Sequence, residues 1–145
     1  MSLFFLSLYL YLKYILGMAI GIKFPFQESS EGGVFKYTKT TPDKVRTNLI
    51  ALLTMKRQQR PMNNNLYSPL WDYIFEPWDA ISSDKLQKDL LDKLSTYMPE
   101  IITQDIQFTF DETTAILTTK VIYSLVELGG ATDFVEIDVI MQTTV

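Results

Sequence analysis

The sequence predicts an α+β fold, in which two main helices pack on an antiparallel β-sheet that ends in a three-stranded C-terminal meander. Two leucine-rich stretches with helical spacing lie in the middle of the chain, at 42–56 and 83–97. The C-terminal part alternates apolar and polar side chains between short turns, a pattern typical of consecutive antiparallel strands. No linker, repeat or charge block divides the chain, so we expect a single domain over residues 18–145.

The first segment, residues 1–17, is strongly apolar and is interrupted only by Lys13. Its apolar run is shorter than the roughly 20 residues of a membrane-spanning helix, and it lacks the early basic residues of a secretory signal. It could lie on a membrane, dock on a partner, or be an upstream extension outside the native product. Met18 opens an ordinary start, so we favour the third interpretation and expect no stable membrane insertion.

The next residues predict short extended elements. The apolar stretch Ile20–Phe26 contains Pro25, which limits it to an edge strand or an extended arm. A polar turn follows, and Val34–Tyr37 is long enough for a short strand.

The first helix is predicted over 42–56. Thr41 can cap its N-terminus, Pro42 fits the first helical position, and Asp43 suits the positive end of the helix dipole. Its core-facing positions share one helical face: Val45, Leu49, Leu52 and Leu53.

A basic loop should follow from Lys56 to Pro69, because Pro61 and the neighbouring asparagines cannot continue a helix. One or two helical turns are expected over Leu70–Phe75. The second helix, 83–97, should be capped by Ser82, with Ile81 packing on a leucine as a hydrophobic staple. Its leucines recur every four residues, and Pro99 ends it: Leu86, Leu90 and Leu94.

Three strands complete the chain. Residues 106–110 alternate strictly, 115–128 are β-branched and apolar, and 134–141 alternate again. Turns are expected at 111–113 and 129–130, so the strands should form a meander.

Composition excludes several classes of function. The chain has no histidine and no cysteine, so triads that use histidine, thiolate metal sites and disulfides cannot form. A net charge of -4 argues against nucleic-acid binding. We therefore expect no cofactor, no metal site and no enzyme activity. Basic residues gather between Lys36 and Arg60 and acidic ones after Glu100, and this polarity suits oriented protein partners or two ordinary solvated faces.

The segment Asn48–Asn63 resembles the signature of the baseplate wedge proteins of contractile phage tails. This family includes the small wedge subunit of T-even phages and its type VI secretion counterpart. Its members have a helix that ends in leucine–threonine, then a basic loop with arginine and asparagine; here these are Leu53, Thr54, Arg60 and Asn63.

The resemblance extends from about Gly21 to the C-terminus. The family's short helix ends in leucine–phenylalanine–glutamate, where this chain has Ile74, Phe75 and Glu76, and its second helix closes at a tyrosine and a proline, here Tyr97 and Pro99.

The resemblance implies a structural subunit of a virion tail baseplate, assembled in the host cytoplasm. Its partners would be the other baseplate wedge proteins, whose core bundle it binds, and the tail sheath protein, whose strands add to its sheet and so template the first sheath ring. The strand at 134–141 is a suitable edge for strand addition, or an ordinary edge protected by charge. The candidate partner-binding residues are Arg57, Arg60, Pro61, Asn63, Glu76, Pro99, Glu100, Glu136 and Asp138.

The chain departs from the family at two places. The family's proline and glycine after the loop asparagine are replaced by Asn64 and Tyr67. The family's glutamate–proline–arginine triplet, which helps to dock the subunit on other wedge proteins, reads Met98-Pro99-Glu100, so we expect the docking there to be altered or directed at a basic partner.

A membrane-associated or wall-hydrolysing accessory protein, similar to a lysozyme, is the alternative. Glycoside hydrolysis needs two carboxylates roughly 5–9 Å apart, and Asp72 and Glu76 could share a helix face beside aromatic residues. A capping or anchoring role for Glu76 is the competing interpretation. Arg60 should pair with a carboxylate within the chain or across an interface. Three aromatic residues could anchor an interface or pack around the short helix: Trp71, Tyr73 and Trp78.

Overall fold

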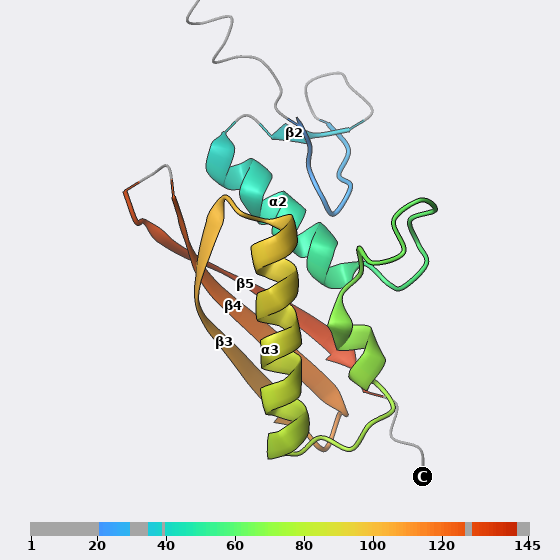
Figure 1. Ribbon diagram of the computed structural model, residues 1–145. Helices are drawn as coiled ribbons and strands as arrows, with labels where there is room; N and C mark the ends of the chain where they lie inside the picture. The colour runs from blue at the N-terminus through green and yellow to red at the C-terminus, as the bar shows by residue number, and fades with distance from the viewer. Residues whose placement is uncertain (1–20, 30–34, 39, 127–128, 142–145) are drawn as a thin grey trace, which may run out of the picture. The chain divides into compact units, whose positions relative to one another are not determined.

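The computed structural model describes residues 21–29, 35–38, 40–126 and 129–141, and it confirms the predicted α+β class (Figure 1). The chain forms two compact units that divide between Asn48 and Leu49. This division falls within one helix, and a single domain over 18–145 stays a prediction. The extension predicted at residues 1–17 lies outside the described residues.

In the first unit, two short strands pair antiparallel. β1 (Gly21–Ile22) lies beside β2 (Tyr37–Thr38), with Gly21 opposite Thr38. Both strands are shorter than the stretches predicted at Ile20–Phe26 and Val34–Tyr37, and β2 begins at the last residue of its predicted range. Beyond β1, the Lys23 N–H still donates to Lys36 O at 2.8 Å, whereas Pro25 has no N–H with which to extend the ladder.

Helix α2 covers Thr41–Thr54 and crosses the division. Its start corrects the predicted cap: Thr40 caps the helix, since its hydroxyl oxygen accepts the Asp43 N–H at 3.4 Å and its hydroxyl donates to the Asp43 carboxylate at 2.9 Å. The Thr54 hydroxyl donates to Ile50 O at 2.8 Å, and the helix ends there, two residues earlier than predicted.

In the second unit, residues 55–68 form the predicted loop, here called the 55–68 loop. A short 3-10 helix, η1 (Pro69–Tyr73), follows it, close to the helical turns predicted over Leu70–Phe75. Ser68 caps η1, because its side chain accepts the Leu70 N–H.

Helix α3 covers Ala80–Tyr97 and begins three residues earlier than predicted. The predicted cap, Ser82, is wrong: Asp79 is the cap and accepts the Ser82 N–H at 2.7 Å, while the Ser82 hydroxyl donates to Pro77 O. The predicted staple is also absent, because Ile81 falls inside the helix and is 66% exposed.

The sheet has the order β3-β4-β5 and is the predicted meander. β3 (Ile101–Asp111) is longer than predicted and contains a register shift between Thr103 and Asp105. β4 (Ile116–Leu125) and β5 (Thr132–Ile140) pair without irregularity. The sheet is therefore bulged at one edge and regular at the other.

One face of the sheet carries the core of this unit. α3 packs on β3, and the α3 leucines at four-residue spacing are fully buried. Each such leucine contributes roughly 1.5–3 kcal/mol of hydrophobic stabilisation. Strand residues on this inner face are Ile106, Leu117, Val121, Val135 and Val139.

Candidate protein-binding surfaces

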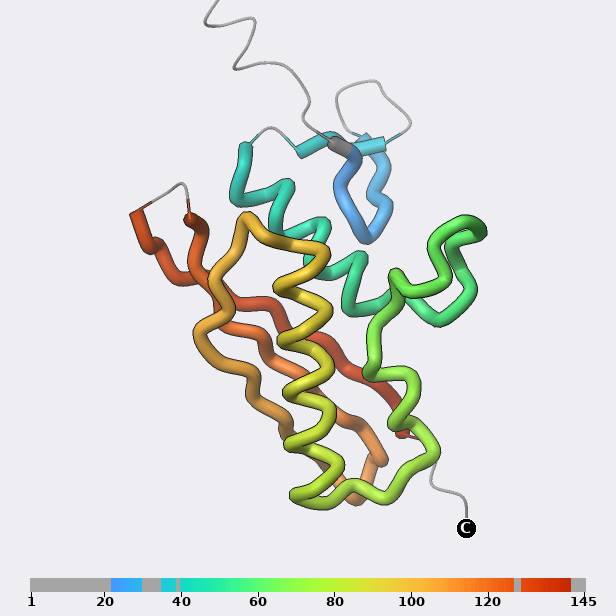
Figure 2. The backbone as a smooth tube through the Cα atoms, in the orientation of Figure 1, coloured from blue at the N-terminus to red at the C-terminus, as the bar shows by residue number. Residues whose placement is uncertain are grey.

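The candidate residues from the sequence lie on separate elements of the second unit. Figure 2 shows the 55–68 loop as an excursion that leaves α2 and returns to η1. This loop carries Arg57, Arg60, Pro61 and Asn63, whereas Glu76 follows η1. Pro99 and Glu100 form the connection between α3 and β3, and Glu136 and Asp138 lie on β5. They are brought together in groups rather than in one site.

The base of the 55–68 loop is closed by backbone hydrogen bonding. The Ser68 N–H donates to Met55 O at 2.8 Å, so the two ends of the excursion are held together. Inside the loop, the Gln59 side chain accepts the Lys56 N–H at 2.9 Å. Gln58 and Met62 have φ of 65° and 79°, in the left-handed region. The loop therefore follows one defined path without regular structure.

Two cations hold Tyr67 on the flank of the loop. Arg57 Nη2 donates to the Tyr67 hydroxyl at 2.7 Å and to Asp72 at 3.1 Å, and its guanidinium lies 4.5 Å from the centre of the Tyr67 ring. Lys93, from α3, lies 4.4 Å from the same ring centre and also donates to Asn65 O. The hydrogen bond and charge of Asp72 raise the pKa of Arg57. These contacts join the loop to η1 and α3.

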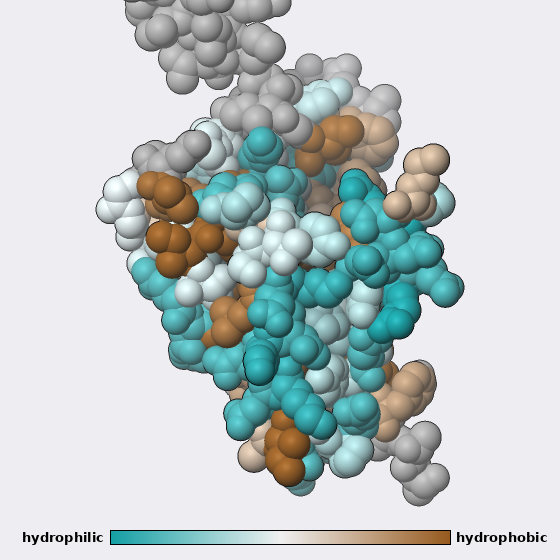
Figure 3. All heavy atoms as spheres, in the orientation of Figure 1, coloured by the Kyte–Doolittle hydropathy of each residue, from teal (hydrophilic) through white to brown (hydrophobic). Residues whose placement is uncertain are grey.

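The tip of the loop is free of such contacts. Arg60, Pro61 and Asn63 are exposed, and Met62 is fully exposed. Within the described ranges, the Arg60 side chain makes no ion pair or hydrogen bond, so no intramolecular partner for it is seen there. Arg57 makes the internal pair instead. Figure 3 shows hydrophilic residues in the region of this loop and groups of apolar residues elsewhere on the same face.

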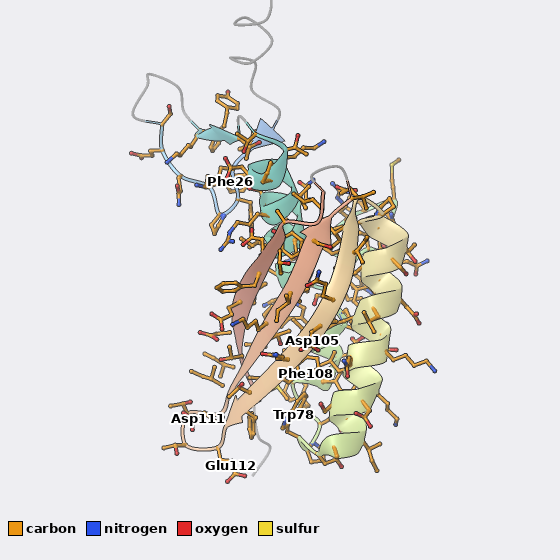
Figure 4. The ribbon with its side chains drawn as sticks, turned by 90° about the vertical axis from the view of Figure 1, so that its left-hand side faces the viewer. Phe26, Trp78, Asp105, Phe108, Asp111 and Glu112 are labelled. Carbon is orange, nitrogen blue, oxygen red and sulfur yellow. The ribbon has the colours of Figure 1, made fainter. Side chains whose placement is uncertain are left out.

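The two carboxylates of the lysozyme alternative have different surroundings. Asp72 is engaged by Arg57 at 3.1 Å. Glu76 is exposed, beside an exposed Phe75, and Trp78 packs edge-on against Phe108, with the ring centres 5.5 Å apart (Figure 4). Glu76 therefore lies at the protein surface.

Two of the three aromatic residues near η1 serve packing rather than forming an exposed anchor. Tyr73 is buried and donates to Asp89 at 3.1 Å, and burial raises its pKa to about 12. Trp71 is half-buried, with Lys56 over its ring at 4.5 Å. The core-packing interpretation is the better one for Tyr73 and Trp78.

The segment Met98-Pro99-Glu100 is divided between core and surface. Met98 is buried and its N–H donates to Leu94 O at 2.9 Å, which ends α3. Pro99 is exposed and Glu100 half-buried, and Glu100 O accepts the Val126 N–H at 3.2 Å. A charged side chain in place of Met98 would be buried in this chain, which accounts for the apolar residue there.

The edge of β5 is regular and unpaired among the described strands. The Met141 N–H donates to Ala115 O at 2.7 Å, so odd-numbered residues direct their backbone groups to β4. Even-numbered residues, including Glu136 and Asp138, therefore direct theirs to the open edge. The opposite edge, β3, carries a bulge, a device that discourages strand pairing.

Two further findings concern metal binding and membrane-spanning helices. Over the described ranges, no three acidic, histidine or cysteine side chains gather in a way that could hold a metal ion. No helix in the part of the chain searched is long and apolar enough to cross a membrane.

No family model matches the sequence, and no curated protein matches it. Among solved structures, the chain is similar to a Geobacter sulfurreducens protein provisionally named a tail lysozyme, with a TM-score of 0.65 and 11% identity over 74% of this chain and 96% of that one. It is also similar to a chain in the cryo-electron microscopy structure of the anti-feeding prophage baseplate, with a TM-score of 0.56 and 14% identity over 83% of this chain and 84% of that one. The chain therefore shares its fold with a protein named for a tail and with a component of a baseplate structure.

Proposed function

We propose that this chain is a non-enzymatic structural subunit of a contractile tail baseplate and belongs to the baseplate wedge family. The observation that carries this is the shared fold with the anti-feeding prophage baseplate chain over most of both chains. The sequence resemblance around Arg60 points to the same family independently of the fold.

The regular edge of β5 supports a more specific role. Strand addition requires an open edge whose backbone groups can accept a new strand, and β5 (Thr132–Ile140) offers one, mainly from Glu136 to Ile140. We propose that a tail sheath strand adds here, so that the subunit templates the first sheath ring.

The loop and the two connections supply the wedge contacts in this proposal. The 55–68 loop presents Arg60, Pro61 and Asn63 from a base that is pinned by Arg57. A preorganised loop loses little conformational entropy when it binds. Glu76, Pro99 and Glu100 are assigned to the same wedge contacts.

Co-expression with the cognate wedge and sheath proteins, followed by affinity purification, tests the function. The native chain should co-purify with both, and failure with every one of them contradicts the proposal. Arg60→Glu should abolish the wedge complex while circular dichroism stays native. Lys88→Glu, which reverses another exposed cation on α3, is the matched control and should bind normally.

A further inference from the structure

We propose that the β5 edge selects an extended segment with apolar side chains at its first and seventh positions and basic side chains at its third and fifth. This inference rests on the strand-addition function proposed above and names the chemistry of the strand that adds. It follows from which β5 residues face the open edge and which charges remain unpaired there.

The same residues supply the backbone groups and the exposed side chains of this edge. Even-numbered β5 residues direct their N–H and C=O outward, and their side chains lie on the sheet face opposite the core, since Val135 and Val139 are buried. In an added antiparallel strand, the residue directly opposite each of them shares this outer face. The side chain of each such residue in the added strand therefore contacts the β5 side chain directly opposite it.

The middle of the edge is acidic and incompletely paired. Lys120 lies directly opposite Glu136 in the β4–β5 ladder, but its ammonium rests over the Phe134 ring, 4.3 Å from the centre. Among the described residues, the Glu136 carboxylate has no hydrogen bond or ion pair. From the part of the chain that the structure describes, Asp138 accepts only the Thr118 hydroxyl, at 2.7 Å. Two basic side chains of an added strand would pair with these carboxylates directly and diagonally.

The ends of the edge are apolar. Phe134 is 45% exposed and Ile140 is 68% exposed. The Phe134 N–H already donates to the Asp133 side chain at 2.8 Å, so main-chain pairing is available mainly from Glu136 to Ile140. Phe134 then contributes its ring as an apolar contact at the far end of the added segment.

A second copy of the chain is a poor occupant. The antiparallel register that overlaps these positions most fully sets Phe134 opposite Ile140 and Glu136 opposite Asp138, twice over. Like charges directly opposite each other are destabilising in a sheet. Two copies of the β5 edge therefore repel each other, whereas a strand of opposite charge is attracted.

Three nine-residue peptides, amidated and labelled with fluorescein at the N-terminus, test this on the full chain by fluorescence anisotropy. TVTKTKTVT carries the proposed pattern, TVTETETVT reverses its charge, and TVKTTTKVT keeps the composition but moves both lysines to the other face. The first should bind about tenfold more tightly than each of the others, since two cross-strand pairs change. Equal binding, or no binding by any peptide, overturns the proposal.

Charge reversal on the protein locates the effect. Glu136→Lys/Asp138→Lys should invert the preference, so that the glutamate peptide binds best. Asp105→Lys/Glu112→Lys makes the same change in net charge at β3 and the β3–β4 turn, which Figure 4 shows, and should leave the preference intact. Inversion by the control pair overturns the assignment to β5.

The peptide-binding result can be distinguished from the co-purification result that tests the proposed function. Co-purification with wedge and sheath proteins without peptide selectivity removes only the strand chemistry. Selectivity without co-purification keeps the edge chemistry and removes the baseplate assignment.

Discussion

Arg57 and Asp72 are joined across the base of the 55–68 loop, with Arg57 Nη2 3.1 Å from Asp72 Oδ2. The side chains are 57% and 40% exposed, so solvent screens the pair and its contribution to global stability is small. Its effect is local: together with the bond to Tyr67 it fixes where the loop leaves the helix.

Loss of this pair should loosen the loop without unfolding the protein. We expect Asp72→Asn to speed amide hydrogen exchange at residues 55–68, with the melting temperature nearly unchanged. Asp84→Asn, which removes an exposed carboxylate in α3, is the control and should leave exchange in the loop unchanged. Unchanged exchange in Asp72→Asn would show that the loop is held by other contacts.

Tyr73 should make stability depend on alkaline pH. Burial and then the hydrogen bond to Asp89 raise its pKa from 10.0 to about 12, so the folded state keeps a proton that the unfolded state releases. Its contribution is complete below about pH 10 and is lost as pH rises through about 12. Urea unfolding across this range should show a flatter decline for Tyr73→Phe than for the native chain. Parallel declines would contradict this.

Asp79 should stabilise α3 through its ionised carboxylate. The hydrogen bonds from Ser82 lower the pKa of Asp79, so its contribution is present above about pH 3.8 and is lost as pH falls through the lowered value. We expect Asp79→Ala to lower the melting temperature by roughly 3 °C at neutral pH, and by less in acid. Asp84→Ala, inside the helix, should show neither effect; a deficit in Asp79→Ala that persists in acid would refute the charge-dependent cap.

Neighbouring leucines on α3 should differ sharply in their effect on stability. Leu90 is 1% exposed and Leu91 is 39% exposed. Leu90→Ala should lower the free energy of unfolding by about 2–5 kcal/mol, because it leaves a cavity against the sheet. Leu91→Ala should cost less than about 1 kcal/mol. Chemical denaturation measures both, and similar losses would mean that the helix is rotated from the orientation described.

Removal of the β5 charges should cause self-association. Glu136→Thr/Asp138→Thr keeps β-propensity but removes the like-charge contact that opposes pairing of two copies. Sedimentation velocity should show a larger species for this variant than for the native chain at equal concentration. Asp105→Thr/Glu112→Thr is the matched control, and an unchanged sedimentation profile in the β5 variant would show that charge does not protect the edge.

The fold class followed from local patterns, and so did its main elements. The leucine spacing of α3 and the alternation in β5 reflect burial on one face, which each segment carries in its own sequence. The predicted helix starts are less accurate because neighbouring polar residues compete for the cap: Thr40 rather than Thr41 caps α2, and Asp79 rather than Ser82 caps α3. Backbone geometry decides between such neighbours.

The candidate surfaces were predicted less completely, because their contacts join distant residues. Tyr67 and Lys93 were not among the candidates, yet they form the flank of the loop with Arg57. These contacts join residues that are ten or more positions apart, and no periodic sequence pattern predicts contacts of that kind. A tyrosine in a basic loop was the only local hint of stacking by cations.

Alternate residues of β5 have different roles. Odd-numbered residues such as Val135 and Val139 serve the core and pair with β4, whereas even-numbered residues such as Glu136 and Asp138 face the open edge. A substitution at an even position can change what the edge recognises while leaving the core intact. The core side and the open edge of this strand can therefore be altered independently by substitution.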